Sequence, residues 1–288
     1  MRTNWFNSLL DILYPKLCIT CDRQLKVVEN QICTNCLMEL PYTDTHKVGL
    51  MALENKFIGR VEITKIFSFV RFSKKSGVQK LLHALKYKDN EKIGFDVGVY
   101  YGKLIEKEIN EYNLDFFIPV PIHPKKLKIR GYNQAEVFAK GLTKSLEIET
   151  KSNILQKTKE TVSQTKENKQ ERFENIKGSF QIKDEKAVKG KNVGVVDDVL
   201  TTGATLEEIA QILKKAGVSK VFIITIAATA GLTSVMLVMM LGQTRIFLGM
   251  AKDGLLPPFF KDLHANFKTP YKSTYLVGAI IAVVAAFT

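Results

Sequence analysis

The stretch VVDDVLTTGAT, residues 195–205, is an apolar run that ends in two adjacent carboxylates and continues into a turn of threonine and glycine. It belongs to KNVGVVDD (191–198), which reads as a buried β-strand, and a helix is expected from Leu206 to Ala216. Two adjacent acids at the end of such a strand are unfavourable unless a cation or hydroxyl groups meet them. Ligands of open α/β sheets bind at strand-to-helix turns of this kind. The stretch therefore predicts both an α/β fold and a ligand site.

The turn is predicted to bind an anion at one end of a sugar. Its threonine hydroxyls and backbone N–H groups lie at the expected N-terminus of a helix, and glycine allows a ligand to approach closely. The two aspartates offer acceptors to a ribose diol or, through water, to a divalent cation. A ribose 5-phosphate satisfies both halves. The expected ligand-binding residues are Asp197, Asp198, Thr201, Thr202, Gly203, Ala204 and Thr205. The alternative interpretation is an acidic helix N-terminus capped by threonine.

Strands and helices alternate through the middle of the chain. Strands are expected over 61–72, 115–121 and 220–227, and helices over 77–94, 95–112 and 132–146. The polar segment 157–180 is expected to form a loop and a surface helix. Alternation of this kind predicts a parallel, doubly wound α/β layer.

All four cysteines lie near the N-terminus in two CxxC pairs, namely Cys18 with Cys21 and Cys33 with Cys36. Two such turns complete a closed, tetrahedral, structural zinc site. The alternatives are two disulfides or four free thiols, and without a secretory signal a reducing compartment disfavours the disulfides. The residues before the first pair have Trp5, Leu9 and Leu13 at helical spacing, but Asp11 interrupts them. They predict a short amphipathic helix rather than a signal peptide or a membrane span.

The chain is strongly basic, with 42 Lys and Arg against 29 Asp and Glu and a formal charge of +13. Such a surface attracts phosphate-bearing partners without recognising them specifically. The loop PIHPKKLKIRGYNQ (121–134) concentrates cations directly after a strand, and Lys126 and Arg130 are the expected anion contacts. The remaining lysines of the loop are also consistent with a solvated basic face. His123 is expected to be a hydrogen-bonding loop residue rather than a general base.

Single-stranded DNA is a weaker candidate partner. Basic segments around 83–92 and 125–130 lie near aromatic residues on which unpaired bases could stack, namely Phe72, Tyr87 and Tyr132. Aromatic residues beside lysines are more often the edge of a core, so both interpretations stay open.

VGVVDDVLTTGAT resembles the phosphoribosyl pyrophosphate motif of type I phosphoribosyltransferases. Together with the double CxxC, LKYKDNEKIG (85–94), IPVPIHPKKLKIRGYNQAEVFAKGL (118–142) and the spaced Gln164, Arg172, Asn175, Gly178 and Phe180, it is similar to the ComF family of competence-associated proteins. The resemblance covers residues 1–227. It implies a zinc-ribbon-like head, Mg²⁺ with phosphoribosyl pyrophosphate, and a role in uptake and processing of single-stranded DNA beside a competence helicase machinery. In this superfamily a segment such as 157–180 closes over the substrate, with Arg172 pointing in, and the alternative is an exposed loop with salt-bridged charges. The expected catalytic residues are Asp197, Asp198, Arg130 and Arg172. Transferase activity is less strongly implied than the fold.

The composition changes near Ala227. No charged residue occurs between Ala228 and Arg245, and a second apolar run begins at Ser273. Joined to the preceding strand, the first run is long enough to cross a bilayer. The tail resembles a fragment of the amino acid, polyamine and organocation transporter superfamily, particularly cationic amino acid transporters. One and a half expected spans do not make a transport path, so the chain reads as a chimera whose head carries the function.

Three parts are therefore expected: an N-terminal helix with a zinc-binding head of four cysteines (1–45), a phosphoribosyltransferase-like domain (46–227) and a truncated transporter-like tail (228–288). Residues 1–227 are expected to be cytoplasmic and to bind phosphoribosyl pyrophosphate or a ribose 5-phosphate nucleotide. The alternative is a membrane component whose location is set by the tail.

Overall fold

The computed structural model describes residues 15–73, 76–86, 90–159, 178–229, 232–264 and 269–286. The helix expected around Trp5 to Leu13 lies outside the described residues. Contacts divide the chain into two compact units, Met1–Ala230 and Gly231–Thr288, each considered by itself below. The division of the first unit near residue 45 stays a prediction.

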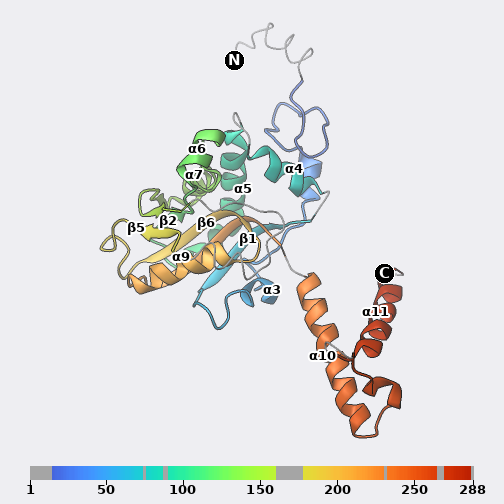
Figure 1. The fold of residues 1–288 in the computed structure, drawn as a ribbon. Coiled ribbons are helices and arrows are strands. Elements are labelled where there is room, and N and C mark those ends of the chain that lie inside the picture. Colours follow the sequence, from blue (N-terminus) through green and yellow to red (C-terminus); the bar gives the residue numbers. More distant parts are fainter. Residues whose placement is uncertain are drawn as a thin grey trace, which may run out of the picture. The chain divides into compact units, whose positions relative to one another are not determined.

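The first unit contains a five-stranded sheet with the order β1-β7-β6-β2-β3, and every strand pair in it is parallel. The strands are β1 (Lys65–Arg71), β2 (Phe116–Pro119), β3 (Glu149–Thr150), β6 (Asn192–Leu200) and β7 (Lys220–Ala228). The parallel α/β layer predicted from the sequence is confirmed. Strand β6 lies at the centre of the sheet, between β7 and β2 (Figure 1). Its carboxyl end therefore lies in the middle of the row formed by the carboxyl ends of the parallel strands.

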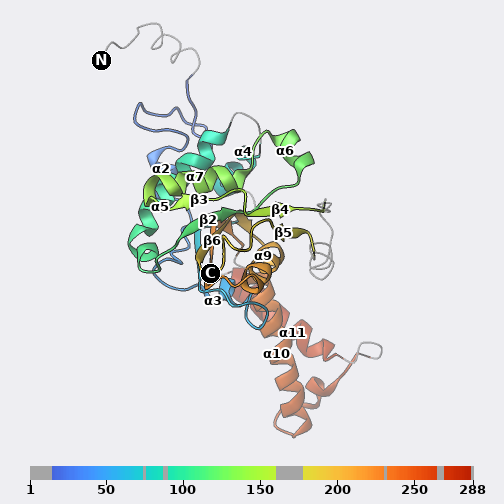
Figure 2. The ribbon, with the colours of Figure 1, turned by 90° about the vertical axis from the view of Figure 1, so that its left-hand side faces the viewer.

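Helices cover both faces of this sheet, as Figure 1 and Figure 2 show. One face packs against α4 (Gly77–Ala84), α5 (Glu91–Asn110) and α7 (Gln134–Leu146). The other face packs against α9 (Ala204–Lys215) and the short α3 (Met51–Glu54). Since both faces are covered, β6 and β7 are apolar along most of their length instead of alternating.

Helices α5 and α7 approach each other closely through two glycines. A Cβ atom on Gly98 would overlap the carbonyl oxygen of Phe138, and one on Gly141 would overlap that of Phe95. The absence of side chains at both positions lets the two backbones meet, which fixes α7 and the loop before it against the sheet.

Two regions differ from the elements expected. The segment 77–94 was expected to be one helix, but α4 ends at Ala84 and α5 begins at Glu91. The basic loop after β2 contains a helix, α6 (Pro124–Arg130), with Pro124 in its first turn. A small antiparallel pair, β4 (Leu155–Lys157) and β5 (Phe180–Ile182), flanks residues 160–177, which lie outside the described residues.

The cysteine-containing head includes α2 (Thr34–Met38) and is attached to the sheet domain by specific contacts. The Lys80 amino group on α4 lies 2.9 Å from a carboxylate oxygen of Asp22. The Tyr42 hydroxyl donates to the carbonyl oxygen of Leu37 at 2.7 Å and lies 3.1 Å from the Tyr100 hydroxyl on α5. These contacts make the head a part of the first unit.

The second unit consists of α10 (Leu232–Lys252), the 3₁₀-helix η1 (Pro258–Lys261) and α11 (Tyr271–Ala286). Among the described residues, no helix combines the length and the apolar character needed to cross a bilayer, so the expected membrane-spanning tail is not supported.

Candidate functional site

Asp197 and Asp198 lie near the carboxyl end of β6, which continues to Leu200. Both residues are half-buried. Asp197 pairs in register with Thr225 of β7, and its Oδ1 accepts a hydrogen bond from the Asp198 N–H at 2.9 Å. The central strand thus brings both carboxyl groups to the sheet edge where the ligand was predicted.

The Asp197 carboxyl is electrostatically unfavourable without a ligand. Burial raises its pKa well above the ordinary value for aspartate, and the neighbouring Asp198 raises it further. The Lys157 amino group acts in the opposite direction. A carboxyl in this condition is stabilised by a bound cation or by hydroxyl donors.

The turn after β6 places a glycine with left-handed backbone directly before α9. Gly203 has a φ of +87° and is the N-cap of α9, which begins at Ala204. The Thr202 Oγ1 accepts a hydrogen bond from the Ala204 N–H at 3.4 Å. A small pocket of about 30 Å³ is lined by Asp197 and residues 199–206. Thr201, Thr202, Gly203, Ala204 and Thr205 therefore meet Asp197 in one concavity at the N-terminus of a 12-residue helix.

The basic residues after β2 lie on α6 and not in an irregular loop. Arg130 is half-buried, and its guanidinium donates to Gln134 Oε1 at 2.8 Å. Lys126 is half-buried on the same helix. The His123 Nδ1 accepts from the Lys125 N–H at 3.3 Å as the N-cap of α6, which agrees with its predicted role as a hydrogen-bonding residue.

Lys157 is a candidate site residue that the sequence analysis missed. Burial lowers its pKa, the nearby Lys126 lowers it further, and Asp197 and Glu208 raise it. Its amino group also lies 5.2 Å from the centre of the Phe180 ring. Lys126, Lys157 and Asp197 are thus close enough to interact electrostatically. The signal in the sequence was weak, because Lys157 stands at the start of a long polar segment.

Arg172, predicted to be catalytic, lies outside the described residues, as do Gln164 and Asn175. Among the described residues, the proposed stacking aromatic Tyr132 is not available to a base. Tyr132 is 6 % exposed and its hydroxyl donates to the Leu85 carbonyl oxygen at 2.6 Å, so its ring belongs to the core. Phe72 is half-buried, and Tyr87 lies outside the described residues.

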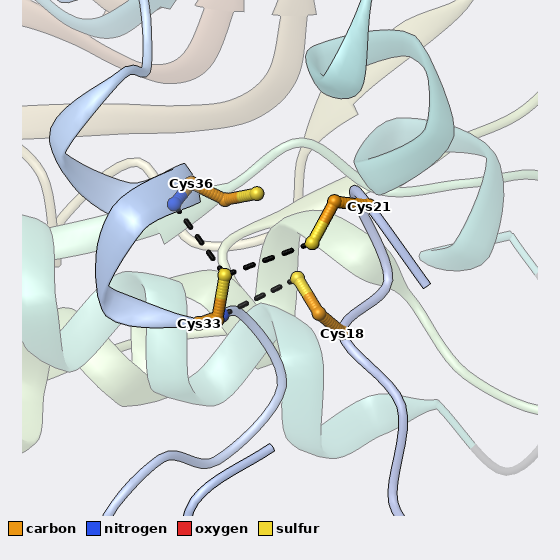
Figure 3. A group of neighbouring side chains, drawn as sticks. All are labelled: Cys18, Cys21, Cys33 and Cys36. Carbon is orange, nitrogen blue, oxygen red and sulfur yellow. Dashed lines mark hydrogen bonds between the residues drawn. The ribbon is translucent and has the colours of Figure 1, made fainter. Parts of the chain in front are cut away.

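The four cysteines converge although one pair lies in a loop and the other lies at the start of α2 (Figure 3). All four sulfur atoms lie within 4.8 Å of one another, and those of Cys21 and Cys33 are 3.7 Å apart. Two thiolates on one tetrahedral zinc ion, each at ~2.3 Å, are separated by about 3.8 Å. The geometry therefore fits a metal ion with four thiolate ligands.

Backbone N–H groups lower the pKa of one thiol in this cluster. Burial alone would raise the pKa of Cys18, but N–H donors from Cys33, Cys21 and Thr20 outweigh it and lower that pKa to about 6. The Cys33 N–H donates to the Cys18 sulfur at 3.3 Å. Burial raises the pKa of Cys36. The Cys18 thiolate therefore forms readily, whereas the Cys36 thiolate needs a cation to stabilise it.

Two larger cavities lie away from the aspartates. One of about 690 Å³ is lined by Glu54 and residues 57–66, and one of about 280 Å³ lies between the head and α5. Neither combines a helix N-terminus with cations. The turn is the better candidate for an anion site, because it combines the N-terminus of α9 with the nearby Lys157.

Comparison with known families gives two matches along the chain. Residues 132–235 match the phosphoribosyl transferase domain, and residues 192–288 match the amino acid permease family. The two ranges overlap over 192–235, which includes the aspartates and the turn.

The individual relatives fall into two groups that correspond to these two family matches. Competence protein F of Haemophilus influenzae is 28% identical over 216 residues, which cover 74% of this chain and 90% of that protein. The DNA utilization protein YhgH of Escherichia coli O157:H7 is 34% identical over 107 residues, or 37% of this chain and 46% of that protein. A methylthioribose transporter of Bacillus subtilis is 43% identical over 65 residues, which are 23% of this chain but 14% of the transporter.

The phosphoribosyl transferase match includes the central strand, both aspartates and the turn, and the permease match includes the whole second unit. The chain thus contains a ComF-like phosphoribosyltransferase segment, followed by a segment similar to part of an amino acid permease.

Proposed function

We propose that the first unit binds phosphoribosyl pyrophosphate, or a ribose 5-phosphate nucleotide, together with Mg²⁺. The observation that carries the proposal is the placement of Asp197 and Asp198 directly before a glycine-containing turn that opens α9. One end of this arrangement accepts hydroxyl groups and the other attracts an anion. A sugar with a vicinal diol and a terminal phosphate matches both ends.

Each group of residues has a defined task in this proposal. The N–H and hydroxyl groups of residues 201–205 bind the 5-phosphate at the positive end of α9. Asp197 and Asp198 accept hydrogen bonds from the ribose hydroxyls and keep the sugar in one orientation. Lys126, Arg130 and Lys157 neutralise the pyrophosphate from the side of α6 and β4. Their placement stabilises negative charge on a leaving pyrophosphate, which is the main demand of pentosyl transfer.

The donor set fits magnesium, because carboxylate oxygens and phosphate oxygens are the ligands that Mg²⁺ takes. When bound, the ion would supply positive charge to the pyrophosphate and offset the raised pKa of Asp197. The proposal concerns binding and positioning, and transfer to an acceptor is a further step that the same site would serve.

We also propose that the cysteine cluster binds one structural zinc ion through Cys18, Cys21, Cys33 and Cys36. Four sulfur ligands leave no open position for a substrate, so the ion would stabilise the head rather than take part in catalysis. The metal would link two short loops that have little apolar core of their own.

The relatives named for competence and DNA utilization support a role for this chain in the uptake or processing of DNA. Single-stranded DNA and a competence helicase machinery are the proposed partners. Helix α6 is the surface best suited to contact phosphates, because Lys125 and Lys128 lie on it and its described residues bury no side chain. If α6 binds single strands, affinity should fall steeply with salt, and replacing both lysines by alanine should flatten that dependence.

The permease match favours a second candidate, in which the tail brings the chain to a membrane and sets its location. Cell fractionation separates the two. The tail governs location if the full chain stays with membranes after a high-salt wash while a chain lacking residues 231–288 does not.

Calorimetric titration with phosphoribosyl pyrophosphate, with and without Mg²⁺, tests the main proposal. We expect magnesium-dependent binding that weakens by about 100-fold or more when Asp197 and Asp198 are both replaced by alanine, since two charge-assisted contacts are lost. The control is Asp184→Ala, which removes one acid from an exposed turn elsewhere. Unchanged affinity in the double variant would refute the site.

A further inference from the structure

A segment far away in the sequence packs against the back of the phosphate turn. We define the strap as residues 50–61, which comprise α3 and the turns that follow it. It is anchored in the core that lies between the sheet and α9, because Leu53 is fully buried and Phe57 is 2 % exposed there. Leu200 and Leu206, which flank the turn, belong to the same core. The strap and the turn are therefore packed on shared side chains.

Lys56 makes the most direct contact between the two. Its amino group donates to the carbonyl oxygen of Thr201, the first residue of the turn, and to that of Thr229 at 3.0 Å. Thr229 itself donates its N–H to the Leu200 carbonyl oxygen at 2.9 Å. One ammonium group thus joins the start of the turn to the end of β7.

Two neighbours of Lys56, namely Phe57 and Arg60, contact the turn and the helix that follows it. A Cβ atom on Gly203 would lie 3.2 Å from Cζ of Phe57, so this ring touches the turn at its left-handed residue. The Arg60 guanidinium donates to a carboxylate oxygen of Glu207 at 3.2 Å, in the first turn of α9. The strap therefore contacts the turn at its beginning, at its centre and at the helix that follows.

The contacts of Lys56 lie on the carbonyl side of the turn. A turn binds phosphate when its N–H groups face the ligand and its carbonyl groups face away. Lys56 occupies the carbonyl side, since it donates to two carbonyl oxygens, and none of the residues lining the small pocket belongs to the strap. Its positive charge also offsets the partial negative charge of these carbonyls close to the bound anion.

We propose that Lys56 is a positioning residue that holds the turn 201–205 in its anion-binding shape from behind, without contacting the ligand. This inference rests on the proposed function for the identity of the ligand. The predicted effect of Lys56 on the turn does not depend on that function, because Lys56 contacts the turn in the ligand-free protein.

The test compares Lys56→Met with Lys56→Arg and with Lys215→Met in the full chain. Lys215 lies in the last turn of α9 and is exposed, so its replacement removes the same charge far from the turn. Two quantities are measured: amide hydrogen exchange over residues 201–205 without ligand, and affinity for phosphoribosyl pyrophosphate with Mg²⁺.

We expect faster exchange at the turn and about 10-fold weaker binding in Lys56→Met, with wild-type behaviour in Lys215→Met and most of the affinity retained in Lys56→Arg. If Lys56→Met matches Lys215→Met in both quantities, the inference is wrong. If the wild-type protein does not bind the ligand, the proposed function fails, and exchange alone decides the inference: faster exchange in Lys56→Met supports it and equal exchange overturns it. Lys56→Gln replaces the methionine variant if the latter does not fold.

Discussion

Asp197 shows how a ligand site can oppose stability. Burial and Asp198 raise its pKa in the folded protein, so between the unfolded and the folded pKa the native state binds more protons than the unfolded chain. Stability is therefore lost as pH rises through this interval, and the carboxyl destabilises the ligand-free fold once it is ionised. The same charge is what the proposed cation and sugar need.

Replacing Asp197 by asparagine should separate these two effects. The variant keeps an oxygen that can accept from the Asp198 N–H but loses the buried charge. We expect its thermal midpoint without ligand at pH 7 to rise by about 2–4 °C, the shift that ~1 kcal/mol produces in a domain of this size. Calorimetry at pH 4 and pH 7 measures it, and the gain should shrink at the lower pH. A lower midpoint at pH 7 would contradict the assignment.

The cysteine head depends on a set of four residues, and any one of them should be essential for metal binding. Cys36→Ser should reduce the metal content from about one zinc per chain to a small fraction of that, because a tetrahedral site with three thiolates binds weakly. Elemental analysis of the purified protein measures it. Asn35→Ser, an exposed neighbour on α2, should retain the metal. Equal zinc content in the two variants would show that the cluster does not hold the ion.

The contact between α5 and α7 should tolerate no side chain at its centre. Gly98→Ala places a methyl group against the backbone of α7, which cannot move aside, and should lower the free energy of unfolding by about 1–3 kcal/mol. Urea denaturation measures the change. At Gly94 a Cβ atom would meet side chains of Leu85 and Val137 at 3.2 Å, and these can adjust. Gly94→Ala should therefore cost less, and a reversed order would be inconsistent with the packing described.

The elements predicted from the sequence were those with a strong apolar pattern. Strands β6 and β7 are buried on both faces, so their apolar runs were unambiguous, and Gly217 ended the helix between them where expected. Helix α6 was missed because it buries no residue, which leaves Leu127 and Ile129 exposed and no amphipathic period to detect. The position of Lys157 beside Asp197 follows from the pairing of β4 with β5 across a long polar segment, which no local pattern reveals.

The division into two compact units predicts that the first unit binds its ligand independently of the second. A fragment of residues 1–230 contains the sheet, the turn, the strap and the head, whereas the permease-like helices lie in the other unit. We expect the fragment to bind phosphoribosyl pyrophosphate within about 3-fold of the full chain, a difference of less than about 1 kcal/mol. Titration of both proteins under the same conditions measures this. A fragment that folds but binds at least 10-fold more weakly would assign part of the site to the tail.

The proposed function of the molecule depends on one arrangement, in which a ribose phosphate lies between the end of β6 and the start of α9. A crystal structure of the protein with phosphoribosyl pyrophosphate and Mg²⁺ examines it directly. We predict that the 5-phosphate lies on the N–H groups of residues 201–205 and that the ribose hydroxyls face Asp197 and Asp198. Ligand density elsewhere, with this turn empty at saturating concentration, would contradict the central claim.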